Sequence, residues 1–209
     1  MKQIRVSVLI ASHRRALLPR ALASVFAQTL PMTQIQVLVN FSADPGLFFN
    51  NWNSLAAIAS GDYFVILGDD DTLEPTYLEA SLDTLDRTGA DIAYSDVWVR
   101  NNDGEPIELY RPPGEITLET MREGNKIWQS SVVRASRWRA VGGYDGLIPQ
   151  VLDYDFWVRC LKDGATTVYL PMCGWNYYEH DGERMTTSTD HAIAWTRFDL
   201  KHPGFRLAP

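Results

Sequence analysis

Residues 61–71 read GDYFVILGDDD, and the rest of the chain can be organised around this stretch. The apolar run 63–67 is β-branched or aromatic at most positions, which is typical of a buried strand. Gly68 and three aspartates follow it directly. Because adjacent carboxylates repel one another unless a cation or water lies among them, a hard divalent metal ion is one interpretation. The other is a solvated acidic turn before a helix, since Thr72 and Glu74 also suit a helix start.

The composition is that of an ordinary globular protein. The chain has 209 residues, of which 45% are hydrophobic and 22% charged, enough to bury a full core in one domain. With 26 acidic and 19 basic residues, the net charge is −7, which argues against a nucleic-acid partner. No apolar run approaches the roughly 20 residues of a membrane span, and the apolar run near the N-terminus is shorter than the core and cleavage site expected of a secretion signal. We therefore expect a cytoplasmic protein, and the oligomeric state stays open.

Strands and helices are expected to alternate along the chain. Strands are predicted at 4–11, 34–39, 63–67, 91–99, 127–133 and 166–170, and helices at 17–28, 52–60, 77–88, 137–141, 153–162 and 192–200. Pro171 should close the last strand. The first strand, helix and second strand form a βαβ unit, which predicts a parallel sheet. Since ligands bind at the carboxyl ends of such strands, Ala11 and Asn40 should face the crevice that receives the three aspartates.

Several motifs occur in an order that resembles family 2 glycosyltransferases of GT-A fold. They are VSVLIASHRR at 6–15, LVN at 38–40, NSLAAIASGDYFVILGDDDTLEP at 53–75, GGYD at 142–145 and LDYDFWVRCLKDG at 152–164. The resemblance implies an α/β sandwich of GT-A type with a mostly parallel central sheet flanked by helices. It also implies a single domain. Its nucleotide-sugar-binding half would be 1–100, its acceptor-side half 101–180, and its C-terminal loop and helix 181–209.

The resemblance further implies an inverting transfer of a sugar from a nucleotide diphosphate sugar to a hydroxyl acceptor, a glycan or a lipid-linked glycan. Mn2+ or Mg2+ would bridge the diphosphate to Asp70 and Asp71, with Asp69 towards the ribose or the metal ion. A divalent ion stabilises the negative charge that develops on the leaving diphosphate. Asp153 matches the general base, which takes the proton of the acceptor hydroxyl. Asp155, the second acid of that motif, is expected on the acceptor side, where it orients the helix start.

The nucleotide is expected in the crevice formed by the ends of the first two strands. The donor-binding candidates are Ala11, Ser12, His13, Arg14, Asn40, Asp44, Asn53, Asp69 and Arg184. Arg14 can pair with a phosphate. Asn40 stands where the family has a carboxylate that reads the uracil edge, so a UDP-sugar is favoured while GDP- and dTDP-sugars stay open. The short segment 44–53 predicts a trimmed nucleotide subdomain.

Two further groups of residues are candidates for the donor and the metal ion. Trp128 and Gln129, on the strand expected at 127–133, would line the sugar or the acceptor, because aromatic rings pack against sugar faces; a core tryptophan is the alternative. His180 would meet the metal ion, and its imidazole suits Mn2+ better than Mg2+. Arg184 would bind phosphate when its loop closes. A plain surface loop is the alternative for both. The helix at 192–200 would cover the core, join a partner subunit or touch the inner face of a membrane.

Three positions depart from the family pattern and keep other functions open. Gly68 and Leu152 stand where the family carries acids, and Asn40 replaces a third. These departures are compatible with a degenerate nucleotide-sugar-binding module without activity. A nucleotidyltransferase that makes a sugar nucleotide would also use a metal-binding acid in an α/β sheet. Such an enzyme normally has a glycine-rich phosphate loop near its N-terminus, and SHRR at 12–15 is not one.

Overall fold

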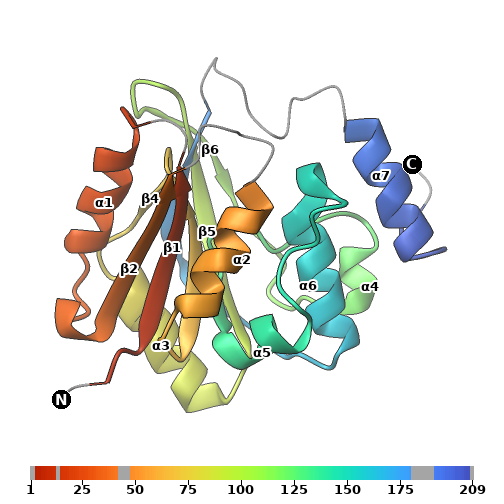
Figure 1. Cartoon of the computed structure of the whole chain (residues 1–209), viewed down its shortest axis with the longest axis horizontal. Coiled ribbons are helices and arrows are strands. Elements are labelled where there is room, and N and C mark those ends of the chain that lie inside the picture. The colour runs from red at the N-terminus through yellow and green to blue at the C-terminus, as the bar shows by residue number, and fades with distance from the viewer. Residues whose placement is uncertain (1–2, 13–14, 42–47, 180–190, 208–209) are drawn as a thin grey trace.

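A mixed sheet of eight strands forms the centre of the computed structural model, and helices pack on both of its faces (Figure 1). The structure describes residues 3–12, 15–41, 48–179 and 191–207. The strands in it are β1 (Val6–Ser12), β2 (Ile35–Phe41), β3 (Tyr63–Gly68), β4 (Thr72–Leu73), β5 (Ile92–Arg100), β6 (Pro106–Tyr110), β7 (Val132–Arg134) and β8 (Thr167–Tyr178). The helices are α1 (Leu18–Phe26), α2 (Phe48–Ile58), α3 (Tyr77–Thr88), α4 (Leu118–Met121), α5 (Ala135–Ala140), α6 (Leu152–Lys162) and α7 (His191–Lys201), with short 3-10 turns at Met32–Gln34 and Pro149–Val151.

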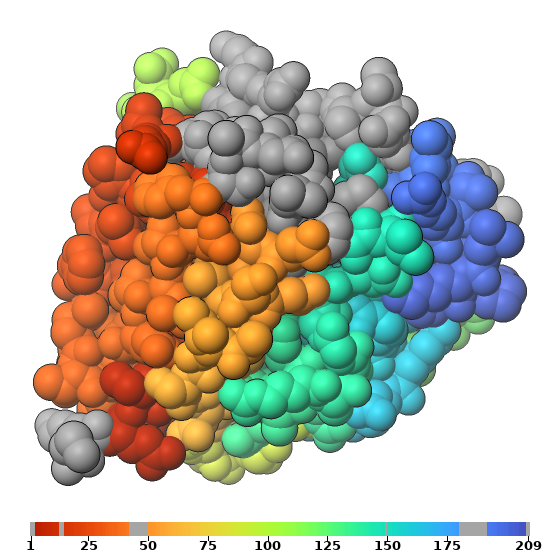
Figure 2. Space-filling model, viewed as in Figure 1, coloured from red at the N-terminus to blue at the C-terminus, as the bar shows by residue number. Residues whose placement is uncertain are grey.

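Alternation along the central strands divides the core between the two faces of the sheet. In β3, Tyr63, Val65 and Leu67 pack with α1 and α3, whereas Phe64 and Ile66 pack with α2, α5 and α6 on the other face. This is the two-residue period of a strand buried on both sides. Figure 2 shows α2, α5 and α6 side by side on one face of the molecule, with α7 at its edge. The α/β sandwich expected from the sequence is confirmed.

The direction of the strands agrees with the expected mostly parallel sheet, because β1, β2, β3, β5 and β8 run the same way and only the short β4, β6 and β7 run the other way. The order is β2-β1-β3-β7-β5-β8-β4, with β6 beside β5. The pairs β1–β2, β1–β3 and β5–β8 are parallel, and the pairs β3–β7, β5–β7, β4–β8 and β5–β6 are antiparallel. The parallel βαβ unit at the N-terminus is therefore confirmed, but β7 enters between β3 and β5 in the opposite direction. Apolar periodicity carries no information about direction, so this reversal was not visible in the sequence.

Two predicted strands have different bounds in the structure. The strand expected at 127–133 begins only at Val132, because a turn precedes it. A hydrogen bond of 3.1 Å from the Ser131 N–H to the Trp128 carbonyl closes this turn. The last strand does not end at Pro171 but continues to Tyr178. The register shifts between Ser95 and Val97, so the sheet bulges where proline offers no N–H to the ladder. A Cβ at Gly174 would lie 2.2 Å from Ser95 Oγ, so only glycine fits this approach.

Candidate functional site

The carboxyl ends of β1, β2 and β3 meet at one edge of the sheet. Ala11 in β1 pairs with Asn40 in β2 on one side and with Gly68 in β3 on the other. Ala11 and Ser12 are buried and Asn40 is partly exposed. The strand ends that were expected to receive the donor therefore lie side by side. In Figure 1 the carboxyl end of β1 and the first turn of α6 lie towards the same end of the molecule.

Asp69 is the most deeply placed of the three consecutive aspartates. Its side chain accepts a hydrogen bond from Ser12 Oγ at 2.8 Å, and both residues are buried. This bond ties the end of β1 to the end of β3. Asp69 is 2% exposed, so the hydrogen bond from Ser12 holds its carboxylate in a buried position.

Asp70 and Asp71 converge on the space that Gly68 leaves empty. A Cβ placed at Gly68 would lie 2.7 Å from Asp70 Oδ1 and 2.8 Å from Asp71 Oδ2. The other oxygen of Asp71 accepts the Tyr178 N–H at 3.1 Å, and the Asp71 N–H reaches the Gly68 carbonyl at 3.4 Å. The turn after β3 thereby brings two carboxylates together. The glycine at a position where an acid was expected has a steric reason, because a side chain there would displace both carboxylates.

The donor set at this turn fits part of a divalent-metal shell. Two carboxylate oxygens approaching one point are hard ligands of the kind that Mg2+ and Mn2+ prefer. Mg2+ characteristically takes only one or two protein carboxylates and fills its shell with phosphate and water oxygens. Within the described residues, no group of three or more His, Cys, Asp or Glu side chains could hold a metal ion. Asp70 and Asp71 would therefore share any ion with oxygens of a ligand.

Arg20 is a residue of this region that sequence reasoning missed. It lies on α1, donates from Nη2 to the Asp70 carbonyl, and places its guanidinium carbon 3.5 Å from the centre of the Tyr178 ring. Its Nε is buried without a hydrogen-bond partner. A cation beside the three acids offsets part of their mutual repulsion. Only the fold brings it there, since 50 residues separate Arg20 from Asp70.

Trp128 and Gln129 lie in the turn before β7 and not on a strand, which corrects the prediction. Trp128 stacks on Tyr110 with ring centroids 4.7 Å apart and packs edge-on against Tyr177. Ser130, next in the turn, donates to the Ile66 carbonyl at 2.9 Å and accepts from Tyr77 OH at 3.0 Å. These bonds hold the turn against β3. Gln129 Nε2 is buried and has no hydrogen-bond partner among the described residues.

Asp153 lies in the first turn of α6 and is partly exposed. Its Oδ1 accepts the Tyr154 N–H and its Oδ2 accepts Asn125 Nδ2, both at 2.8 Å. Burial of the carboxyl group raises its pKa to about 6, even though the hydrogen bonds from Tyr154 and Asn125 act in the opposite direction. A carboxylate whose pKa is close to neutral can accept a proton efficiently. Asn125 was not singled out from the sequence.

Asp155 is fully buried and cannot touch a ligand in the crevice, so it is not an acceptor contact. It accepts hydrogen bonds from Arg159 Nε at 2.8 Å, His202 Nε2 at 2.9 Å and Lys201 Nζ at 3.1 Å. Burial alone would raise the pKa of Asp155, but the His202 hydrogen bond and the charge of Arg159 lower it to about 2. Its expected part in orienting the helix start agrees with these contacts, which join α6 to α7.

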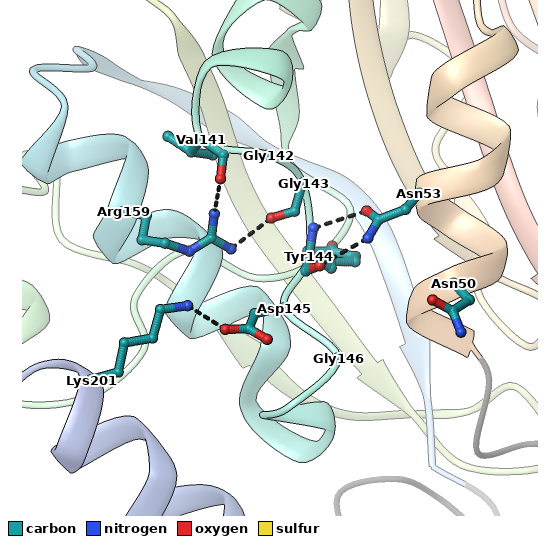
Figure 3. A pocket seen from close by; sticks show the side chains of 10 residues that line it. All are labelled: Asn50, Asn53, Val141, Gly142, Gly143, Tyr144, Asp145, Gly146, Arg159 and Lys201. Carbon is teal, nitrogen blue, oxygen red and sulfur yellow. Dashed lines mark hydrogen bonds and ion pairs between the residues drawn. The ribbon is translucent and has the colours of Figure 1, made fainter.

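The side-chain amide of Asn53 forms hydrogen bonds within the protein. Its Nδ2 donates to the Tyr144 carbonyl at 2.8 Å, and its Oδ1 accepts the Tyr144 N–H at 2.9 Å (Figure 3). This pair of bonds fastens α2 to the turn at 142–145, and the assignment of Asn53 to donor binding stays a prediction. Beside it lies a cavity of about 420 Å3. Asn50, Asp145 and Lys201 line its sides, and Lys201 contacts Asp145 at 2.6 Å.

Five predicted site residues lie outside the residues that the structure describes. They are His13, Arg14, Asp44, His180 and Arg184. The assignments of phosphate to Arg14 and Arg184, and of a metal ion to His180, therefore stay predictions. Asp44 and the trimmed subdomain at 44–53 do as well.

The sequence matches one family profile, described as Glycosyl transferase family 2, over residues 48–141. The matched region begins with α2, contains GDYFVILGDDD and ends just before the turn at 142–145. It thus includes Asp69, Asp70 and Asp71 but not Asp153. No curated protein sequence matches the chain.

Solved structures of TarS from S. aureus have the same fold. The complex of TarS 1-349 with UDP-GlcNAc superposes with a TM-score of 0.77 over 98% of this chain, at 13% identity. The complex with UDP gives 0.70 over 84% at 12% identity, and TarS itself gives 0.73 over 98% at 12% identity. The chain spans 68%, 60% and 40% of those chains, respectively. Among the helices described here, none combines the length and apolarity needed to cross a membrane.

Proposed function

We propose that this chain, a family 2 glycosyltransferase of GT-A fold by its profile match and its architecture, transfers a sugar from a UDP-sugar to a hydroxyl acceptor with inversion. The observation that carries the proposal is the convergence of Asp70 and Asp71 on the space at Gly68. It supplies two hard oxygen ligands at the edge of the sheet where α/β folds bind nucleotides. The UDP and UDP-GlcNAc complexes of TarS support uridine as the base.

Asp70 and Asp71 are the residues that would hold a Mn2+ or Mg2+ ion for the donor diphosphate. Such an ion, when bound, supplies neutralisation of the charge that develops on the leaving diphosphate. Asp69, held by Ser12, lines the crevice next to this position. Arg20 adds a fixed positive charge beside the same turn. The crevice can therefore accept a doubly charged diphosphate although the net charge of the chain is −7.

Asp153 acts as the general base in this proposal. The proton of the acceptor hydroxyl moves to an oxygen of Asp153 while the acceptor oxygen forms a bond to the anomeric carbon. At the same time the bond from that carbon to the diphosphate oxygen breaks, and its electron pair stays with the UDP. A base with a pKa of about 6 is ionised at neutral pH and still holds a transferred proton well.

The structure of the acceptor side leaves the acceptor class as a prediction. Leu152, which stands where the family carries an acid, is 3% exposed and packs in the core. It cannot contact an acceptor, so another group must do so. The expected classes are a glycan or a lipid-linked glycan, reached in the cytoplasm or at the inner face of a membrane. Neither the exposed residues of α7 nor the crevice selects between them.

The test is metal-dependent donor binding and turnover. Purified protein should bind UDP with Mn2+ present and lose binding in EDTA, as measured by calorimetry. It should also hydrolyse slowly, or transfer, one sugar from a panel of UDP-, GDP- and dTDP-sugars. Asp70→Ala should weaken Mn2+-dependent UDP binding at least tenfold. Asp83→Ala, an exposed residue of α3 with the same change in charge, is the matched control.

Each outcome separates the proposed function from its alternatives. Binding of UDP without turnover of any donor in the presence of simple sugar acceptors would indicate a binding module. Formation of a sugar nucleotide from a sugar phosphate and UTP would indicate a nucleotidyltransferase. Absence of metal-dependent nucleotide binding would overturn both enzymatic proposals.

A further inference from the structure

We propose that Asn125 is a positioning residue that holds the Asp153 carboxylate in its reactive orientation and keeps it ionised at the pH of the reaction. This inference rests on the proposed function, because it assigns Asn125 to the base of that reaction. Asn125 lies in the loop between α4 and β7, 28 residues from Asp153, and the two side chains meet at 2.8 Å. Nothing in the motifs of the sequence marks it.

The amide of Asn125 is held in one orientation. Its Oδ1 accepts the backbone N–H of Ile127 at 3.3 Å, so the amide nitrogen is the atom that faces Asp153. An amide carries separate donor and acceptor ends. The backbone bond therefore determines that Asn125 offers Asp153 a donor. A donor stabilises the ionised form of a carboxyl group and disfavours the protonated form.

The loop around Asn125 is fixed on both sides. On its N-terminal side, the Met121 carbonyl accepts a hydrogen bond from Tyr154 OH, and Met121 Sδ lies 3.4 Å from the N–H of Lys126. After it, Tyr110 OH donates to the Lys126 carbonyl at 3.4 Å. Because Tyr154 adjoins Asp153 on α6, the same helix positions both the carboxylate and the loop. A side chain on such a frame can set the orientation of its partner.

The carboxylate of Asp153 has one donor on each oxygen. The Tyr154 N–H contacts Oδ1 and Asn125 Nδ2 contacts Oδ2. The first donor belongs to the backbone, so Asn125 is the side chain that fixes the rotation of the carboxylate and leaves lone pairs on both oxygens for an acceptor hydroxyl. The donor is uncharged, so it directs Asp153 without lowering its pKa as far as a cation would.

Three other sets of titratable groups lie near Asp153, and their contacts differ from that of Asn125. From the turn at 142–145, Tyr144 presents a buried phenol whose pKa is raised well above its ordinary value by burial and by the charge of Asp153. In the loop of Asn125, Glu123 and Lys126 pair with each other at 3.7 Å. On α6, Asp155 points into the contacts with α7. None of these side chains donates to Asp153 in the hydrogen bonds described above.

The test is the pH profile of turnover for Asn125→Ala and Asn125→Asp. Loss of a hydrogen bond to a charged group moves a pKa by about one unit. The acid limb of kcat should therefore move about one pH unit upward in Asn125→Ala. It should move further in Asn125→Asp, which keeps the shape but places a second carboxylate beside the first. Turnover at the alkaline plateau should fall about tenfold in Asn125→Ala, because orientation is lost, while Mn2+-dependent UDP affinity should stay within twofold.

A matched control and a second readout keep the test decisive. Glu123→Gln alters the same loop at an exposed position and should leave the profile unchanged. The carboxyl 13C shift of Asp153, followed by NMR titration, should give a pKa of about 6 in the parent and a higher value in both Asn125 variants. Equal pKa values and equal profiles in parent and variants would overturn the assignment of Asn125.

The failure of this inference can be told apart from failure of the proposed function. If Asp153→Asn retains full transfer, the base assignment fails, and the inference about Asn125 fails with it. If Asp153→Asn loses transfer while the Asn125 variants keep the parent's profile and pKa, only Asn125 is misassigned. A variant with lower thermal stability but an unchanged profile would show that Asn125 merely supports the loop.

Discussion

The two sides of the first turn of α6 hold their carboxylates in opposite ways. On the side of the α4–β7 loop, Asp153 is partly exposed, receives uncharged donors, and has its pKa raised by burial to about 6. On the side of α7, Asp155 is fully buried, yet Arg159, Lys201 and His202 surround it. Burial would raise its pKa too, but these partners lower it to about 2.

The comparison shows that the partners, and not the depth of burial, determine what each acid can do. Asp155 is the more deeply buried of the two and nevertheless the stronger acid, because charged donors stabilise its ionised form. It cannot accept a proton near neutral pH. Asp153 has no cationic partner among its hydrogen bonds and retains the proton affinity that a base requires. Two residues apart in sequence, one acid is suited to chemistry and the other to holding helices together.

Exchange of Asp153, the proposed base, for its amide should have the largest effect. Asp153→Asn should reduce turnover by about 10³-fold, because general base catalysis contributes roughly 10² to 10⁴. Affinity for UDP with Mn2+ should remain, since Asp153 does not take part in the turn after β3. Single-turnover transfer and calorimetry on the same preparation check both statements. Turnover within tenfold of the parent would place the base elsewhere.

The same exchange two residues later should act on stability and not on chemistry. Asp155→Asn leaves Arg159 and Lys201 beside a neutral buried amide, and loss of one partner of a buried ion pair costs about 3 to 5 kcal/mol. Urea unfolding measures this change. Asp145→Asn is the matched control, because Asp145 also pairs with Lys201 but at a partly exposed position, where such a pair contributes less than about 1 kcal/mol. Equal losses in the two variants would contradict the comparison.

The two acids should also give stability opposite dependences on pH. Asp153 has a folded pKa of about 6 against an ordinary 3.8, so the folded state keeps a proton that the unfolded state has released. Its contribution is present below pH 3.8 and is lost as the pH rises through 6. Between pH 4 and 7 the parent should lose about 2 kcal/mol relative to Asp153→Asn, allowing for partial exposure.

Asp155 should make the free energy of unfolding depend on pH in the opposite direction. Its folded pKa of about 2 lies below 3.8, so its contribution is present above pH 3.8 and is lost as the pH falls towards 2. Urea unfolding of the parent and of both variants at pH 3, 4, 5, 6 and 7 separates the two effects. Parallel curves for the parent and Asp153→Asn between pH 4 and 7 would contradict the raised pKa.

Periodicity was enough to find most of the fold. The nearly continuous apolar runs of β1 and β3 and the helical spacing in α3 and α6 place these elements close to their observed positions, because apolar patterning is a local property of sequence. Direction and register are not local. The antiparallel entry of β7 and the continuation of β8 past Pro171 depend on partners far along the chain. Residues 128–131 were predicted as strand because apolar residues flank them at 127 and 132, but the hydrogen bond from the Ser131 N–H to the Trp128 carbonyl closes them into a turn.

The acids of the site could be predicted, but their partners could not. The motif order singled out Asp69, Asp70, Asp71 and Asp153, and the structure places the first three at one turn. Asn125 meets Asp153 across 28 residues and His202 meets Asp155 across 47. These contacts arise from the packing of the α4–β7 loop and α7 on α6. The sequence therefore indicated which carboxylates to propose for the site, but not the partners that distinguish Asp153 from Asp155.

A smaller effect on stability than that of Asp155→Asn is expected for a substitution of His202. It tests how much one hydrogen bond contributes to the difference between Asp153 and Asp155. Lys162 Nζ lies 2.9 Å from His202 Nδ1, and a lysine can only donate, so Nδ1 is an acceptor and Nε2–H donates to Asp155 at 2.9 Å. The ring also packs on Phe198 with centroids 4.7 Å apart. His202→Phe keeps an aromatic ring there and removes only the hydrogen bonds.

Because Asp155 keeps Arg159 and Lys201 in His202→Phe, the free energy of unfolding should fall by about 2 kcal/mol, the net contribution of one hydrogen bond to a charged group. Urea unfolding at pH 7 measures it, with Asp155→Asn as the upper reference. If His202→Phe costs as much as Asp155→Asn, the histidine and not the two cations holds Asp155. In that case each acid would be held mainly by a neutral donor, Asn125 for Asp153 and His202 for Asp155. The charges of Arg159 and Lys201 would then not explain why the pKa of Asp155 is lower than that of Asp153.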